Sequence, residues 1–171
     1  LSGFTITNGN GTIRNPQNPQ QKDGGGIYCN SSDPILSNLI IRNNNASIFG
    51  AGIYCQSASP LIENTLISNN ISNWIGGGAY FQNSTSLIKN TIINFNSATT
   101  NAGGIYYLYS NLVLTNVTVV NNQGGAIIRE NAGSESATIL NSIIWYNTGN
   151  IFDPNDPAVV SYSNIEGGYT G

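Results

Sequence analysis

The chain has 171 residues, of which 8% are charged, whereas an average soluble domain carries about 25%. The formal net charge is −3 and the 5 Lys and Arg residues are scattered, which argues against a surface for nucleic acid. The sequence has no His, the usual general base and commonest metal ligand, and no apolar run near the roughly 20 residues of a transmembrane helix. Its polarity comes instead from 28 Asn and from Gly, Ser and Thr, and the absence of Met indicates a processed product or a segment of a longer protein.

Residues 4–8 form the first short apolar segment, and a polar loop follows near residues 9–23. A Gly-rich motif, Gly-Gly-Gly-Ile-Tyr-Cys or a close variant, then begins at positions 24, 50, 76 and 102. The step between copies is 26 residues, and a shorter fifth copy spans residues 124–128. An internal repeat of this length is typical of solenoid proteins.

A second block of the repeat places β-branched residues and Leu on either side of a central Asn. It covers residues 35–41, 61–67, 87–93 and 113–119, then 138–144 one residue early, and residues 162–165 resemble a partial copy. Each unit contains short apolar runs separated by Gly, Asn, Ser and Pro, which is the pattern of strands and turns. No unit has the ten or so residues of 3.6-residue periodicity that a helix needs.

This pattern predicts an all-β fold, a right-handed parallel β-helix with three short strands per turn. Residues 1–171 would form one segment of about seven rungs, each of about 26 residues, stacked about 4.8 Å apart. Longer loops outside the repeat are expected near residues 9–23, 129–136 and 148–158.

Residues one repeat apart lie above one another in a solenoid, so each position of the repeat becomes a column along the axis. Two aliphatic columns are predicted to face the core: Ile6, Ile41, Ile67, Ile93, Val119 and Ile144, and Leu36, Ile62, Ile88, Leu114 and Ile139. Two Asn columns are predicted to form hydrogen-bonded ladders. The first lies at a bend where Asn can adopt the left-handed conformation, and the second closes the next strand: Asn38, Asn64, Asn90, Asn116 and Asn141, and Asn44, Asn70, Asn96, Asn122 and Asn147.

These residues resemble the right-handed parallel β-helix repeat superfamily and, more narrowly, the surface repeats of polymorphic membrane protein adhesins. Such repeats pair a Gly-Gly-Ala-Ile motif with an upstream aromatic-x-x-Asn motif. Residues 124–127 match the first motif, and Ile41-x-x-Asn44 and its equivalents match the second with an aliphatic residue in place of the aromatic one. The resemblance implies the fold, but similar rods occur in adhesins, polysaccharide lyases and hydrolases, and phage fibres.

The acidic residues do not gather as an active site of the pectate-lyase type would require. Only Glu130 with Glu135, and Asp153 with Asp156, are close in sequence, and both pairs lie in loops. The Asp153–Asp156 segment has oxygens that could hold Ca²⁺, but a Pro-bounded turn explains it as well. We therefore expect no catalytic residues, no metal site and no cofactor.

Two columns near the Gly-rich motif carry distinctive side chains. Cys29 and Cys55 share a column with Phe81 and Tyr107, which favours two buried thiols, with a disulfide as the alternative. The neighbouring column consists of Tyr28, Tyr54, Tyr80 and Tyr106, and strand alternation places it on the outside. These rings either pack across the strands or form a platform for sugar rings or a partner protein.

A further apolar column lies next to the Ile41 column, and one of the two must face outward as a possible interface. This stripe comprises Ile40, Leu66, Ile92 and Ile143, extended by Trp145. Asn-x-Ser/Thr sequences make five loop or strand-end residues candidates for glycosylation: Asn10, Asn30, Asn45, Asn70 and Asn83.

Taken together, these observations predict a non-catalytic structural β-solenoid outside the cell or on its surface: an adhesin stalk, a spacer or a filament subunit. Expected partners are further copies of the chain, through end-to-end or lateral contacts, and surface glycans or host proteins. Charges at Ile6 or Ile165 would test end-to-end assembly. The alternative is a carbohydrate-binding or carbohydrate-active β-helix whose catalytic residues lie outside this segment, with the Tyr column as a subsite.

Overall fold

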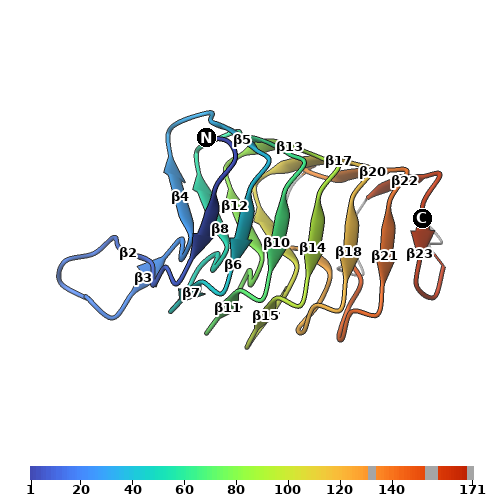
Figure 1. Ribbon diagram of the computed structural model, residues 1–171. Helices are drawn as coiled ribbons and strands as arrows, with labels where there is room; N and C mark the ends of the chain where they lie inside the picture. The colour runs from blue at the N-terminus through green and yellow to red at the C-terminus, as the bar shows by residue number, and fades with distance from the viewer. Residues whose placement is uncertain (131–133, 153–157, 169–171) are drawn as a thin grey trace.

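The chain folds as a parallel β-solenoid in a computed structural model that describes residues 1–130, 134–152 and 158–168. Figure 1 shows the strands of successive turns side by side along an axis that runs from the N-terminal to the C-terminal end of the chain. All the strand pairs between turns are parallel, and no helix occurs in the described ranges. The predicted all-β, parallel β-helix class is confirmed.

Four sheets run along the solenoid, so the prediction of three strands per turn is corrected to four in the turns that carry the short fourth sheet. The longest has seven strands: β1 (Thr5–Thr7), β6 (Ile40–Arg42), β10 (Leu66–Ser68), β14 (Ile92–Asn94), β18 (Thr118–Val120), β21 (Ile143–Trp145) and β23 (Asn164–Ile165). The next has six: β5 (Ile35–Ser37), β9 (Leu61–Glu63), β13 (Thr85–Lys89), β17 (Asn111–Thr115), β20 (Ala137–Leu140) and β22 (Val159–Ser161).

The other two sheets border the loops of the repeat. One has five strands: β4 (Ile27–Asn30), β8 (Ile53–Gln56), β12 (Ala79–Gln82), β16 (Ile105–Leu108) and β19 (Ile127–Arg129). The other has three: β7 (Asn45–Ala46), β11 (Ile71–Ser72) and β15 (Ser97–Ala98). The one antiparallel pair is the hairpin of β2 (Thr12–Ile13) and β3 (Lys22–Asp23), which projects from the N-terminal end of the rod in Figure 1.

The register confirms the columns read from the sequence. Ile41 pairs with Ile67, and Tyr54 pairs with both Tyr28 and Tyr80. The estimate of about seven rungs is corrected to about four complete turns. The first rung adds β1 to the long sheet, but the chain then forms the β2–β3 hairpin instead of completing a turn. The number of strands in the long sheet is therefore larger than the number of complete turns.

One continuous hydrophobic core fills the solenoid, as the aliphatic columns predict. Leu36, Ile62, Ile88, Leu114 and Ile139 are all at most 2% exposed. The Ile41 column is equally buried from Ile41 to Ile144, while Ile6 in the first rung is half-buried. Burying one large aliphatic side chain in this way stabilises the folded state by about 1.5–3 kcal/mol.

The corners between sheets need left-handed backbone, and 10 of the 17 described non-Gly residues with positive φ are Asn. Asn38, Asn64 and Asn90 have φ angles of 53°, 50° and 47°, as expected for the first Asn column. Gly50 has a φ of 57°, and a Cβ there would collide with the backbone of Ile53. These residues turn the chain at low steric cost because Asn and Gly tolerate this region.

Candidate functional site

The second Asn column forms a continuous buried ladder of hydrogen-bonded amides. Asn70 Nδ2 donates to Asn96 Oδ1 over 2.9 Å and to the Ile41 carbonyl over 3.0 Å, and the Asn70 backbone N–H donates to the same Asn96 oxygen over 3.0 Å. The same contacts recur along the column Asn44, Asn70, Asn96, Asn122 and Asn147. The predicted asparagine ladder is confirmed here.

The first Asn column lies on the surface, and its ladder is shorter than predicted. Asn90 Nδ2 donates to Asn64 Oδ1 over 3.2 Å, and Asn116 Nδ2 donates to Asn90 Oδ1 over 3.0 Å. Asn38 donates instead to Ser2 Oγ over 3.2 Å. Asn141 makes no side-chain bond of this kind to the described residues, so this column serves mainly as a series of corners.

The candidate glycosylation residues divide by exposure. Asn10, Asn30, Asn45 and Asn83 are exposed. Asn70 is fully buried and its amide belongs to the ladder, so glycosylation of the folded chain at Asn70 is the wrong expectation.

The outward apolar stripe is the Ile40 column. Ile40, Ile92 and Ile143 are 39%, 45% and 46% exposed, whereas the adjacent Ile41 column is buried. Leu66 and Trp145 are half-buried on the same sheet. The ambiguity between the two columns is thereby resolved, and an interface on this stripe stays a prediction.

The Tyr column lies outside the main core, but loops cover most of it. Tyr54, Tyr80 and Tyr106 are 0%, 2% and 6% exposed, so the expectation of an exposed column is wrong for these three, and only Tyr28 is half-exposed. Their cover is Phe49 and Ile75, each of which directly precedes a Gly-rich motif. The Phe49 ring centroid lies 5.0 Å from that of Tyr80 and 5.7 Å from that of Tyr54.

The rings of the Tyr column stack and then change orientation. Tyr28, Tyr54 and Tyr80 are stacked, with centroids 5.3 and 5.2 Å apart and interplanar angles of 17°. Tyr106 lies edge-on to Tyr80 at 74°. Burial raises the pKa of Tyr54 and Tyr80, because a tyrosinate would be poorly solvated there.

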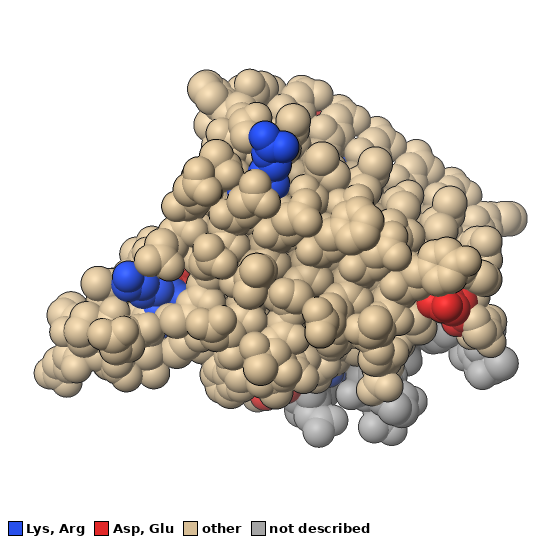
Figure 2. Space-filling model, turned by 60° about the horizontal axis from the view of Figure 1, so that its bottom comes forward, with Lys and Arg blue, Asp and Glu red and all other residues tan. Residues whose placement is uncertain are grey.

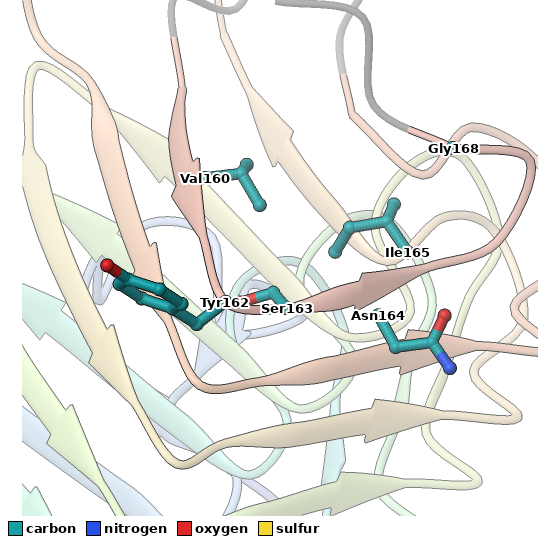
Figure 3. Close-up of a pocket in the computed structure, with 6 residues that line it drawn as sticks. All are labelled: Val160, Tyr162, Ser163, Asn164, Ile165 and Gly168. Atoms are coloured by element: carbon teal, nitrogen blue, oxygen red, sulfur yellow. The ribbon is translucent and has the colours of Figure 1, made fainter.

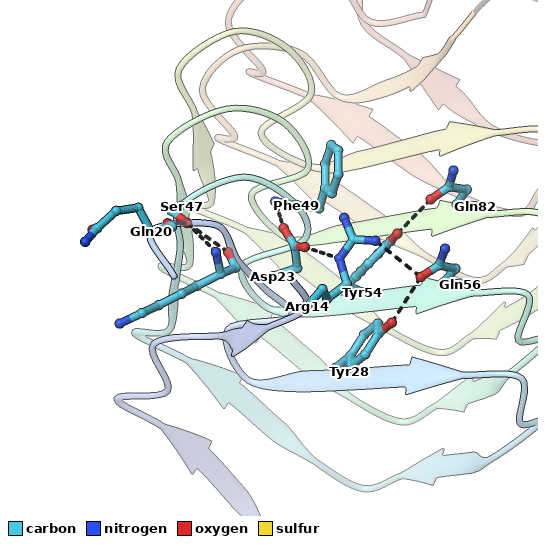
Figure 4. Close-up of polar contacts among 10 residues, drawn as sticks. Arg14, Gln20, Asp23, Tyr28, Ser47, Phe49, Tyr54, Gln56 and Gln82 are labelled. Carbon is cyan, nitrogen blue, oxygen red and sulfur yellow. Dashed lines mark hydrogen bonds and ion pairs between the residues drawn. The ribbon is translucent and has the colours of Figure 1, made fainter. Parts of the chain in front are cut away.

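The hairpin contacts the solenoid at Ser47 and, at the aromatic column, through Arg14 and Asp23 (Figure 4). Arg14 forms an ion pair with the buried Asp23, and its guanidinium lies 5.4 Å from the Phe49 centroid and 5.3 Å from the Tyr54 centroid. Asp23 Oδ1 also accepts the Phe49 backbone N–H over 3.0 Å. Sequence reasoning did not find this cluster, since neither residue belongs to the repeat.

A cavity of about 320 Å³ opens beside Tyr80 and Tyr106, where the stack changes orientation. In the bridge column that covers the tyrosines, Phe49 is followed by Ile75 and then by the polar Asn101. The remaining lining consists of Trp74, Gln82, Thr100, Leu108 and Glu130. An aromatic pocket of this size with a few polar groups is the usual form of a small-molecule site.

A second cavity, of about 340 Å³, lies at the last described rung (Figure 3). It is lined by Val160, Tyr162, Ser163, Asn164, Ile165 and Gly168. Tyr162 is 90% exposed, and none of the described residues that line the cavity is charged. We assign it no binding role.

Cys29 and Cys55 are free and buried in the core, which confirms the favoured prediction. The two residues lie at the same register position in the adjacent strands β4 and β8. A hydrogen bond between the two thiols, and then burial, raises the pKa of Cys55 well above its usual range. Both side chains therefore pack as small apolar residues.

Charged side chains are sparse, and Figure 2 shows them as isolated spots on one face. Among the described residues, no three His, Cys, Asp or Glu side chains are grouped so that they could hold a metal ion. Asp153 and Asp156 lie outside the described residues. Nor does any helix in these ranges have the length and apolarity to cross a membrane.

The fold and these columns define the chain as a parallel β-solenoid built on a buried asparagine ladder. Comparisons with family models, with curated proteins and with solved structures found no match. The finer resemblance to adhesin repeats therefore stays a prediction.

Proposed function

We propose that this chain is a non-catalytic structural β-solenoid, a rigid spacer within an extracellular or cell-surface protein. The observation that supports the proposal best is the buried Asn ladder, in which four of the five amides bond to the turns on both sides: Asn44, Asn70, Asn96 and Asn122. Such a ladder links the turns that it crosses without charge. A rod of this kind holds a distance that depends on the number of turns.

The surface chemistry supports the same proposal. The acidic residues are dispersed, and Glu130 is the one acidic side chain among the described residues that line the aromatic cavity. The exposed loops carry Asn10, Asn30, Asn45 and Asn83 as sites for glycans if the chain passes through a glycosylating compartment.

Negative-stain electron microscopy with light scattering over a hundredfold dilution tests this function. A spacer gives short monodisperse rods at every concentration. Long uniform fibres would instead indicate a filament subunit, in which case charges at Ile6 and Ile165 should abolish assembly. Release of products from a panel of polysaccharides would contradict the proposal.

A second candidate function is carbohydrate binding, favoured by the aromatic cavity. Trp74 is 46% exposed at its rim, and Tyr80 and Tyr106 lie within it. This function is compatible with a spacer, because the cavity lies on the outer side of the solenoid.

A further inference from the structure

We propose that the cavity between Trp74, Tyr80 and Tyr106 binds a neutral pyranose ring, as the end or a branch of a glycan chain. This inference rests on the second proposed function, carbohydrate binding, and names its ligand class; it does not depend on the spacer function, which the microscopy and light scattering test separately. It moves the sugar site from the whole Tyr column, most of which is covered, to the cavity beside Tyr80 and Tyr106.

The opening follows from a change in the loop column above the tyrosines. Phe49 lies 5.0 Å from the ring centroid of Tyr80 and covers it from one side, and Ile75 continues this cover. At the next rung the same position holds Asn101, which leaves space over Tyr80 and Tyr106. The resulting volume of about 320 Å³ is large enough for one sugar ring and part of a second.

The aromatic walls suit the apolar face of a sugar. Trp74 packs on Phe49 with centroids 5.3 Å apart, so its ring is held in place although it is 46% exposed. Exposed Trp74 offers an aromatic surface against which the C–H groups of a pyranose can pack, while the largely buried Tyr80 and Tyr106 close the inner side of the cavity.

The polar walls offer fixed donors and one acceptor for hydroxyl groups. Gln82 Oε1 accepts the Tyr54 hydroxyl over 2.7 Å, which directs the Gln82 amide and leaves its Nε2 as a donor. Asn101 Oδ1 accepts the Ala102 N–H over 3.1 Å and likewise leaves Nδ2 as a donor. The Glu130 carboxylate supplies acceptors.

The charges in and around the cavity select a neutral ligand. No Lys or Arg lines it in the described residues, and Glu130 would repel a uronate or a phosphate. Arg14, on the neighbouring rungs, is engaged by Asp23.

The two Trp residues of the chain make a direct binding assay possible. Trp145 lies in β21 on another sheet, so a Trp145→Phe protein reports on Trp74 alone. We would titrate it with cellobiose, lactose and N,N′-diacetylchitobiose, and with digalacturonate as the anionic comparison. The expected result is a saturable change in Trp74 fluorescence with at least one neutral sugar and at least tenfold weaker binding of digalacturonate.

Variants in the cavity then locate the binding. Gln82→Leu and, by calorimetry, Trp74→Ala should each weaken binding of the same sugar at least tenfold, whereas Phe95→Ala, an exposed aromatic elsewhere, should leave it unchanged. Circular dichroism verifies that each variant is folded. The inference is overturned if none of the three neutral sugars binds to the folded protein, if digalacturonate binds as tightly as they do, or if both cavity variants bind normally.

Discussion

At the scale of single residues, the solenoid depends on buried amides that bond to the turns on both sides. Removing Asn96 would orphan the Asn70 backbone N–H and one N–H of the Asn70 side-chain amide, because Asn96 Oδ1 accepts both in the core. Each unsatisfied buried group costs about 1–3 kcal/mol, so Asn96→Ala should lower the free energy of unfolding by about 3 kcal/mol. Urea denaturation followed by circular dichroism measures this change.

The matched control is Asn90→Gly in the exposed column. Asn90 has a φ of 47°, which Gly tolerates, and its two ladder bonds, to Asn64 and from Asn116, are both exposed to solvent. The expected loss is below about 1 kcal/mol. Equal losses for the two variants would show that burial of the ladder is unimportant.

Phe95 occupies a left-handed corner, although an aromatic residue does not favour this conformation as Asn does. Its φ is 54° and its side chain is 55% exposed, while the same position holds Asn69 and Asn121 in the adjacent rungs. Such a conformation costs a non-Asn residue roughly 1–2 kcal/mol. We predict that Phe95→Asn stabilises the protein by about 1 kcal/mol and that Asn121→Phe destabilises it by a similar amount. A thermal melt of each variant tests this, and a destabilised Phe95→Asn protein would indicate that the ring makes a stabilising contact.

At the scale of elements, the strands were predictable from the sequence because the repeat imposes one register on every turn. The same regularity separated the two faces of each strand, as Ile53 and Tyr54 illustrate. What alternation cannot give is the burial of an outer face, because this depends on loops. The signal was nevertheless present: apolar Phe49 and Ile75 stand directly before the Gly-rich motifs that they cover.

The β2–β3 hairpin lay beyond such reasoning for a physical reason. Arg14 and Asp23 are nine positions apart in a segment without periodicity, and only the hairpin turn brings them together over Phe49 and Tyr54. Likewise, the aromatic cavity lies where the apolar column of Phe49 and Ile75 is interrupted by the polar Asn101. No column of the repeat therefore predicted it. Both the Arg14–Asp23 cluster and the aromatic cavity thus lie where the repeat is interrupted.

The covered Tyr column makes stability depend on alkaline pH. Burial raises the pKa of Tyr54 and Tyr80 above the value near 10 of an unfolded chain, so above about pH 10 the unfolded state loses protons that the folded state keeps. Stability should be unaffected by these groups below about pH 10 and should fall above it by up to about 1.4 kcal/mol per pH unit for each tyrosine.

Urea midpoints between pH 8 and 11.5 measure this dependence. A Tyr54→Phe/Tyr80→Phe variant should show a clearly shallower decline, although it loses the Tyr54 bond to Gln82 at every pH. Tyr146→Phe, which changes a ring that is 68% exposed, is the control and should keep the full decline. If the double variant loses stability with rising pH as steeply as the original protein, groups other than Tyr54 and Tyr80 cause the decline.

At the scale of the whole molecule, the interchangeability of turns is the property that a spacer requires. Residues 50–75 form one turn, and its strands pair with equivalent strands on both sides. A second copy of this segment inserted after Ile75 should therefore continue all the columns, including the Asn ladder. The rod should lengthen by about 4.8 Å, which small-angle scattering detects, and the β-sheet circular dichroism per residue should be unchanged.

The unfolding of the longer chain provides the sharper test. If the added turn joins the cooperative unit, the urea m-value should rise by about 15%, in proportion to the added chain, and the free energy of unfolding should rise with it. A control insertion with the same 26 residues in scrambled order has the same length but no columns, so it should loop out and add neither length nor m-value. If both insertions behaved alike, stacking of turns would not set the length of the rod, and the spacer function would lose its physical basis.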